Sequence, residues 1–309
     1  MKIVVTGGAG FIGRHTVEKL LEDRHQVVVI DHLDGGIRSF YHSGVTFYQM
    51  DIGSEKLAQV MDAERPEGVI HLAGQVSVQR SIQDPSLDAQ HNIMGTVNLL
   101  RQCVNFQVRK FVFSSSAAVY GNPAVLPIHE EHEVAPLSFY GVSKLVSEMY
   151  IRSFSKQFGL DYSILRYANV YGPGQTIKGE GAVVASFITR MLDGLRPSIY
   201  GDGGHSRDFI YVKDVAAANV AALRNASGET MNISSGEPMT IQELFTLLCD
   251  LNGLHMSPDY QESKEGDIVH SLLSNDKARA NLRWEPVYSM ADGLRETLHD
   301  YSLQKSAVL

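Results

Sequence analysis

Three glycines at every third position join the first apolar run of the chain to its first amphipathic segment. Gly7, Gly10 and Gly13 follow the apolar residues 3–5 and open a helical pattern over residues 12–22. In such a strand–turn–helix unit the glycines permit a tight turn, close approach of a pyrophosphate to the backbone, and close helix–strand packing. The amide groups and dipole at the helix start then attract phosphate. The motif therefore predicts a dinucleotide site, with an ordinary tight turn as the alternative.

Apolar runs alternate with amphipathic segments through the first half of the chain. The expected buried strands are Lys2–Thr6, Gln26–Ile30, Gly68–Leu72, Lys110–Ser114 and Ser163–Arg166. The expected helices of this half are Ile12–Glu22, Lys56–Asp62, Leu87–Cys103 and Tyr140–Phe158. Alternation of this kind predicts an α/β fold, a Rossmann-type doubly wound parallel sheet with right-handed crossovers.

Past Arg166 the chain becomes richer in turns, and its pattern changes. The helices expected there are Val183–Asp193, Val212–Arg224, Ile241–Leu251 and Met290–Leu303. This change predicts a smaller α/β substrate lobe, partly interleaved with the sheet. The expected division is a dinucleotide-binding domain over residues 1–170, which also receives roughly 205–235, and a substrate-binding lobe over 171–204 and 236–309.

The length suits two modest domains, or one large α/β domain with a smaller lobe, and the composition is typical of a globular enzyme. The chain has 309 residues, of which 44% are apolar and 20% charged, and a formal net charge of −8. A nucleic-acid binder would show a basic surplus, and no apolar run is long enough to span a bilayer. Two cysteines without paired spacing, and a start without a signal-peptide pattern, predict a cytoplasmic protein. His129 and His132 form a pair in an expected loop without further ligands, so no metal site is predicted.

Asp31 ends the second strand, at the distance from the glycine motif expected of a carboxylate that binds the adenosine ribose. Such a carboxylate accepts hydrogen bonds from both ribose hydroxyls and repels a 2′-phosphate, which favours NAD. Arg14 and Arg38 lie close enough in sequence to leave NADP open. Asp51-Ile52, after the third strand, is expected along the adenine, with a plain turn carboxylate as the alternative.

Tyr140 and Lys144 lie four residues apart in an expected helix and therefore share a face. An ammonium beside a phenol favours the phenolate and lowers the pKa of the tyrosine toward working pH, as a general base needs. Ser116 follows the end of a strand, where the catalytic groups of an open parallel sheet collect. Each feature alone occurs by chance, but together with the glycine motif they predict hydride chemistry on an alcohol or ketone.

The motifs resemble those of the extended short-chain dehydrogenase/reductase family. The similarity lies in Thr6–Gly13 (TGGAGFIG), His71–Gly74 (HLAG), Ser114–Gly121 (SSSAAVYG), Tyr140–Lys144, Arg166–Gly172 (RYANVYG), Tyr200–Val212 and Gly266-Asp267. It covers nearly the whole chain. Within that family the motifs are most similar to the nucleotide-sugar 4-epimerases of the UDP-glucose (UDP-galactose) 4-epimerase type.

The resemblance assigns roles to individual residues. Those it implies for NAD binding are Gly7, Gly10, Phe11, Ile12, Gly13, Asp31, Asp51, Ile52, Ala73, Gly74, Asn92, Ser114, Tyr140 and Lys144. Those it implies for catalysis are Ser116, Tyr140 and Lys144. Those it implies for the UDP-sugar are Ser116, Asn169, Tyr200, Arg207, Lys264, Asp267 and Ser271, with Asn169 and Arg207 at the diphosphate.

Two positions depart from the pattern of these relatives. Lys264 stands where they often have arginine, which keeps the charge but loses the bidentate fork. Gly174 stands where they also commonly carry an arginine. The departures concern the contacts to the sugar nucleotide and leave the cofactor site untouched.

Ala117-Ala118 separates this chain from the dehydratases and decarboxylases of the same family. Those enzymes typically carry an acid in the two positions after the catalytic Ser or Thr, and alanine cannot deliver a proton to a leaving hydroxyl. The reaction that the resemblance then implies is reversible oxidation at C4. A 4-keto sugar forms, rotates about its phosphate link and is reduced on its other face.

The resemblance implies an NAD-dependent 4-epimerase of a UDP-sugar that acts as a homodimer through a four-helix bundle. Ser271 occupies a position beside the sugar where a small residue admits an N-acetyl group, so UDP-N-acetylglucosamine is an expected substrate besides UDP-glucose. A UDP-glucuronate 4-epimerase, a net nucleotide-sugar oxidoreductase and a non-catalytic NAD sensor are the alternatives. The base, uracil or thymine, stays open.

Overall fold

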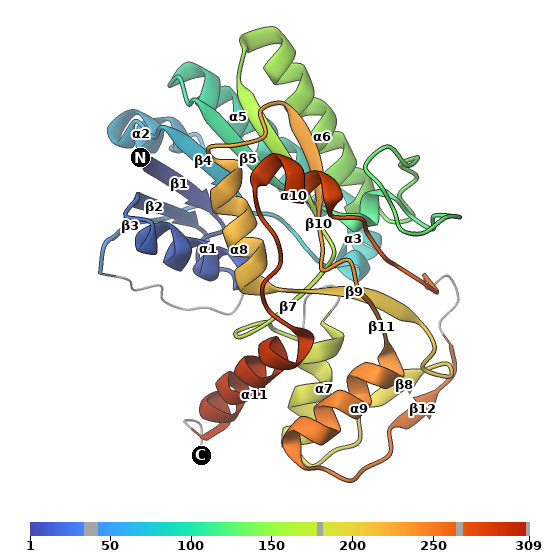
Figure 1. Ribbon diagram of the computed structural model, residues 1–309. Helices are drawn as coiled ribbons and strands as arrows, with labels where there is room; N and C mark the ends of the chain where they lie inside the picture. Colours follow the sequence, from blue (N-terminus) through green and yellow to red (C-terminus); the bar gives the residue numbers. More distant parts are fainter. Residues whose placement is uncertain (34–42, 178–181, 264–267, 307–309) are drawn as a thin grey trace.

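The computed structural model describes residues 1–33, 43–177, 182–263 and 268–306 (Figure 1). Its centre is a seven-stranded parallel sheet in the order β10-β6-β5-β4-β1-β2-β3. The strands are β1 (Lys2–Thr6), β2 (Gln26–Asp31), β3 (Val45–Gln49), β4 (Gly68–His71), β5 (Lys110–Ser116), β6 (Asp161–Tyr167) and β10 (Glu229–Ile233). The predicted parallel α/β sheet is confirmed.

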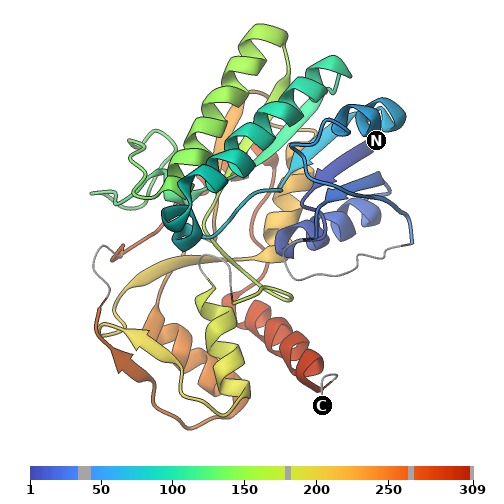
Figure 2. The same ribbon diagram turned by 180° about the vertical axis from the view of Figure 1, so that it is seen from behind.

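Helices cover both faces of this sheet, because successive residues of its apolar strands point to opposite sides. Ile3 and Val5 pack with the helices α1 (Phe11–Glu22), α8 (Val212–Ala222) and α10 (Asp276–Leu282). Val4, on the other face, packs with α2 (Leu57–Glu64), α5 (Gly95–Asn105) and α6 (Phe139–Phe158). Figure 2 shows α5 and α6 side by side on the outside of that second layer.

One expected helix differs from the structure. The pattern over Leu87–Cys103 predicts a single helix, whereas the chain forms α3 (Val78–Gln83), α4 (Pro85–Ala89), a π-helical turn over Gln90–Met94 and then α5. Within the wider π turn, the Asn92 side chain bonds the backbone of Gln75 and the hydroxyl of Ser143 on α6. A tertiary contact of this kind leaves no signal in hydrophobic periodicity, and π turns of this type are frequent at functional sites.

A second group of elements packs around its own apolar core. It holds a three-stranded sheet, β11-β9-β7, and a two-stranded one, β12-β8. The elements are β7 (Asn169–Tyr171), α7 (Val183–Leu192), β8 (Ser198–Tyr200), β9 (Ser206–Tyr211), β11 (Pro238–Thr240), α9 (Ile241–Asn252), β12 (Asp259–Gln261) and α11 (Met290–Ser306). Between them in sequence, α8 and β10 return to the large sheet, so the two groups interleave (Figure 1). The domain boundaries given above remain a prediction.

Among the described residues, no helix is both long and apolar enough to cross a membrane.

Candidate active site

The turn between β1 and α1 can be built only with glycine at two positions. Gly7 has φ +69°, and a Cβ there would lie 2.6 Å from the amide nitrogen of Ala73. A Cβ on Gly13 would lie 2.1 Å from the Gly7 carbonyl oxygen. Gly10 is the N-cap of α1 and offers no side-chain hydrogen bond, so no capping side chain satisfies the first amides of the helix. The turn is thus a tight cradle with helix amides that suit an anion.

Asp31, the last residue of β2, lies beside this cradle. Its carboxylate accepts hydrogen bonds from the amides of Ala9 (3.0 Å) and Leu33 (2.9 Å). Burial raises the pKa of Asp31, but the neighbouring His32 imidazole and the hydrogen bonds from the two amides lower it by more, so that the pKa lies below its usual value. An ionised carboxylate at the end of the second strand suits the hydroxyls of a ribose.

Lys144 and Tyr140 stand on successive turns of α6, which begins after the N-cap Ser138. The Lys144 ammonium donates to the Ser114 carbonyl at 2.9 Å and lies 5.9 Å from the centre of the Tyr140 ring. Burial lowers the pKa of Lys144 to about 8, although the charges of Asp88 and Glu148 oppose that shift. The structure therefore brings together the predicted ammonium and phenol in an apolar setting.

Ser116 ends β5, the strand on which Lys144 is anchored. Its hydroxyl oxygen accepts a hydrogen bond from the Ala118 amide at 3.1 Å, which leaves its own proton to donate elsewhere. In the strand register Ser116 is opposite Tyr167. Burial, and to a smaller degree the charge of Tyr140, raises the pKa of Tyr167. Ser116 and Tyr140 therefore both lie near this tyrosine.

His71 lies below the site and is neutral. Burial, aided by the Lys144 charge, lowers the pKa of His71 to about 3. Thr96 donates its hydroxyl proton to the Asn92 carbonyl at 2.6 Å, so it accepts from Nε2 of His71 at 2.9 Å. Nδ1 of His71 then accepts from Thr6 at 2.7 Å. His71 is therefore a core histidine with both ring nitrogens hydrogen-bonded.

Asn92 holds the loop after β4 against the site. Its side-chain oxygen accepts from the Gln75 amide at 2.8 Å, and a Cβ on Gly74 would lie 2.6 Å from that oxygen. A Cβ on Gly74 would also come within 3.7 Å of the Lys144 nitrogen. Ala73, Gly74, Asn92 and Lys144, all predicted cofactor contacts, therefore lie close together, and Ala73 adjoins Gly7 of the glycine cradle.

The predicted adenine residues lie at the end of β3, on the same edge of the sheet as Asp31. The Asp51 carboxylate accepts from the Gly53 amide at 2.6 Å. Ile52 is buried, and a Cβ on Gly95 would come within 2.8 Å of its side chain. Phe11 and Ile12 open α1 next to Gly10.

The predicted substrate residues are spread over the smaller sheets. The Arg207 guanidinium in β9 and the amide of the buried Ser271 both donate to the Ser206 carbonyl, at 2.9 Å and 3.1 Å. Asn169 opens β7, which pairs with β9. Tyr200 ends β8 in the separate two-stranded sheet. Lys264 and Asp267 lie outside the described residues.

The family model for the NAD dependent epimerase/dehydratase family matches residues 3–234. The chain belongs to that family. The matched segment contains the glycine cradle, the Tyr140–Lys144 pair and the β9 strand with Arg207.

Solved structures of named members of the family are similar over nearly the whole chain. A UDP-glucose 4-epimerase of Thermotoga maritima, with UDP-glucose, is 41% identical with a TM-score of 0.95, over 99% of this chain and 100% of that one. A UDP-glucose 4-epimerase of Thermus thermophilus, in complex with NAD, is 38% identical with a TM-score of 0.91, over 98% and 99%. A UDP-N-acetylglucosamine 4-epimerase of Methanobrevibacter ruminantium, in complex with UDP-N-acetylmuramic acid, is 36% identical with a TM-score of 0.93, over 98% of each chain.

A buried ion pair near Tyr140 and Lys144 was not predicted from the sequence. Glu148, a further turn along α6, is fully buried and pairs through both oxygens with Arg166 of β6, at 2.9 and 2.7 Å. The Ser115 hydroxyl also donates to Glu148 at 2.6 Å. Lys144 to Ser114 and Glu148 to Ser115 are thus two neighbouring ties between α6 and β5. Glu148 at eight residues from Tyr140, on the same helical face, was the available signal.

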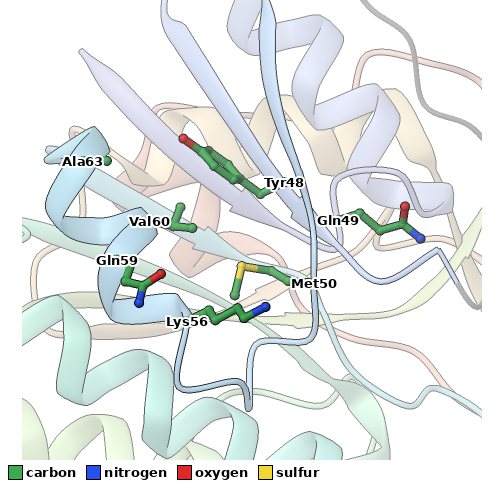
Figure 3. A pocket seen from close by; sticks show the side chains of 7 residues that line it. All are labelled: Tyr48, Gln49, Met50, Lys56, Gln59, Val60 and Ala63. Atoms are coloured by element: carbon green, nitrogen blue, oxygen red, sulfur yellow. The ribbon is translucent and has the colours of Figure 1, made fainter.

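A hollow of about 300 Å³ lies between β3 and α2, outside the cradle (Figure 3). Its lining residues are Tyr48, Gln49, Met50, Lys56, Gln59, Val60 and Ala63. None of them is a predicted site residue, and no group of titratable side chains converges there among the seven. The candidate site lies instead at the carboxyl edge of the large sheet, where the glycine cradle follows β1 and Lys144 contacts the end of β5.

Proposed function

We propose that this chain interconverts the 4-epimers of a UDP-sugar, UDP-glucose and UDP-galactose among them, through a transient 4-keto sugar. The observation that carries the proposal is the buried Lys144 ammonium beside Tyr140, at the same carboxyl edge of the sheet as the glycine cradle, with Ala117-Ala118 where elimination needs an acid. The related Thermotoga maritima enzyme with UDP-glucose supports the substrate class.

The glycine cradle, Asp31 and the Tyr140–Lys144 pair fit NAD. A Cβ on Gly7 or Gly13 would clash with backbone, so these glycines permit the tight turn, and the uncapped amides at the start of α1 suit a pyrophosphate. Asp31 would take the adenosine ribose, and Tyr140 and Lys144 the nicotinamide ribose. When bound, NAD supplies the acceptor, and then the donor, of the hydride at sugar C4.

The chain's own residues manage the proton and the sugar. Tyr140, as phenolate, accepts the proton of the C4 hydroxyl and returns it to the C4 oxygen after the 4-keto sugar has rotated to present its other face. The Lys144 ammonium, held by the Ser114 carbonyl, stabilises that phenolate through its charge. Ser116 donates a hydrogen bond to the C4 oxygen, and Arg207 with Asn169 holds the diphosphate.

Ser271 supports N-acetylated sugars as additional substrates. It is small, buried and tied through its amide to the Ser206 carbonyl, next to Arg207. A small side chain beside the sugar leaves room for an acetamido group. The similar UDP-N-acetylglucosamine 4-epimerase of Methanobrevibacter ruminantium supports this assignment.

A homodimer is proposed on the outer face of α5 and α6. Met94, the last residue of the π-helical turn before α5, and Val142 and Met149, seven residues apart on α6, are 55%, 40% and 58% exposed. The two helices lie side by side there (Figure 2), so an equal pair from a second copy would complete a four-helix bundle. Light scattering of wild type and of Met149→Glu tests this: the wild type has the mass of a dimer and the variant that of a monomer.

Two buried free cysteines support a cytoplasmic location.

Proton NMR of the sugar tests the activity. Purified enzyme is incubated separately with UDP-glucose, UDP-N-acetylglucosamine and UDP-glucuronate, without added NAD. Appearance of the 4-epimer supports the proposal, since no net redox occurs and the cofactor is regenerated in each cycle. Unchanged sugars in all three tubes would refute it, and stoichiometric NADH with an oxidised sugar would indicate a net oxidoreductase.

A further inference from the structure

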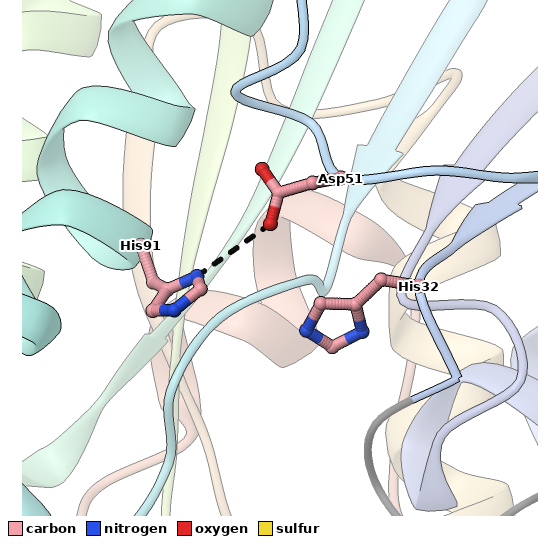
Figure 4. A group of neighbouring side chains, drawn as sticks. All are labelled: His32, Asp51 and His91. Carbon is pink, nitrogen blue, oxygen red and sulfur yellow. Dashed lines mark ion pairs between the residues drawn. The ribbon is translucent and has the colours of Figure 1, made fainter.

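Three side chains of metal-ligand type converge at the edge of the sheet next to Asp31. His32 follows β2, Asp51 follows β3, and His91 comes from the π-helical turn before α5. One ligand atom of each lies within 4.8 Å of the others. Figure 4 shows the two imidazole rings and the carboxylate directed toward one another.

The separation of Asp51 and His91 suits a shared ion better than a hydrogen bond. Nδ1 of His91 lies 3.7 Å from Oδ2 of Asp51. A hydrogen bond between nitrogen and oxygen spans about 2.7–3.2 Å. Two ligands of a tetrahedral zinc with bonds of about 2.0–2.1 Å stand about 3.4 Å apart. Small rotations of these partly exposed side chains are enough to reach that geometry.

Two further contacts orient the ligands, as second partners do in metal sites. Nδ1 of His32 lies 3.6 Å from the Asp31 carboxylate, so that Nε2, across the ring, faces Asp51 and His91. The other oxygen of Asp51, Oδ1, accepts the amide hydrogen of Gly53 at 2.6 Å, which turns Oδ2 toward His91. A histidine backed by a carboxylate is a better metal donor.

We propose that His32, Asp51 and His91 bind a divalent transition ion of the zinc class, with water as its fourth ligand. The ion would coordinate the Asp51 carboxylate and hold the His32 imidazole beside Asp31, where the adenosine half of NAD is expected. Metal and NAD therefore weaken each other's binding by the same factor. This second part rests on the proposed NAD site, whereas the metal site itself does not.

Visible absorption of Co²⁺, used as a stand-in for zinc, tests the site on the full chain stripped of nucleotide. We expect a saturable d–d band from one ion per chain. His32→Gln and His91→Gln each weaken binding at least tenfold, and the control His299→Gln, an exposed histidine on α11, leaves it unchanged. Absence of a saturable band, or equal binding by His91→Gln and wild type, would overturn the metal site.

Repeating the titration with saturating NAD tests the overlap. A Co²⁺ affinity that falls as NAD rises supports it, and an unchanged affinity in NAD-loaded protein refutes it. If the proposed NAD site is itself wrong, no NAD binds while the cobalt band and its loss in His91→Gln persist. The failures of the two proposals are thus distinguishable.

Discussion

Replacing Glu148 by glutamine removes one half of a fully buried ion pair. The Glu148 carboxylate is 0% exposed and Arg166 is 3% exposed. Glutamine keeps one oxygen for Ser115 and for Nε of Arg166, but it turns an amide donor toward Nη2 of Arg166 and of Arg152. Breaking such a pair costs about 3–5 kcal/mol, and the retained oxygen places the expected loss near the lower end, at about 3 kcal/mol.

Equilibrium unfolding in urea at neutral pH measures this loss, with Glu229→Gln as the matched control. Glu229 pairs with Lys277 at 2.9 Å, but both side chains are partly exposed, at 38% and 29%. An exposed pair of this kind contributes at most about 1 kcal/mol. A loss for Glu148→Gln no larger than that of the control would refute the reasoning.

The same variant has an expected dependence on pH. Burial raises the pKa of Glu148, but the hydrogen bonds and charge of Arg166, with Ser115 and Arg152, lower it further, so the folded pKa lies below the ordinary 4.5. A lowered carboxyl pKa stabilises the fold above the unfolded pKa, and this contribution disappears as the pH falls through the folded pKa. The stability gap between wild type and Glu148→Gln is therefore constant near neutral pH and closes only in acid. A gap that stays open in acid contradicts the assignment to charge.

Four further outcomes follow from the site. Gly13→Ala is expected to leave the protein without bound NAD, read from its absorbance, because the new Cβ would lie 2.1 Å from the Gly7 carbonyl; full retention of NAD would contradict the cradle. Tyr140→Phe should lower kcat by about 10²–10⁴ in the NMR assay while NAD stays bound, since the phenyl ring cannot carry the proton; near wild-type turnover would exclude Tyr140 as the base. Because burial lowers the pKa of Lys144 to about 8, kcat should fall above about pH 8 rather than above 10. In Glu148→Gln that alkaline fall should move to lower pH, since Glu148 and Asp88 are the groups that raise this pKa; an unmoved profile would separate Glu148 from Lys144.

Much of the fold was predictable because its signals are local in sequence. The strand Lys2–Thr6 was predicted with its observed bounds, and the helix Tyr140–Phe158 begins one residue earlier in the structure. The helix predicted over Leu87–Cys103 was wrong in its middle, since the π turn at Gln90–Met94 answers to contacts with Gln75 and α6 rather than to periodicity.

The candidate site was predictable to the extent that its members share a motif. Tyr140 and Lys144 are on one helical face by spacing alone, and the structure places Lys144 against the Ser114 carbonyl as a consequence of that face packing on β5. The buried Glu148–Arg166 pair joins a helix to a strand 18 residues on, so helical spacing places Glu148 on the face of Tyr140 but does not reveal its partner.

The sequence by itself determined the glycine cradle, the alternation of strands and helices, and the spacing of the Tyr–Lys pair, because each depends on steric and periodic properties of neighbouring residues. Only the tertiary structure decided the neutral state of His71, the depressed pKa of Lys144 and the meeting of His32, Asp51 and His91. These depend on burial and on distances between residues remote in the chain. The glycine motif thus located the candidate site, and the packing around that site set the protonation of its side chains.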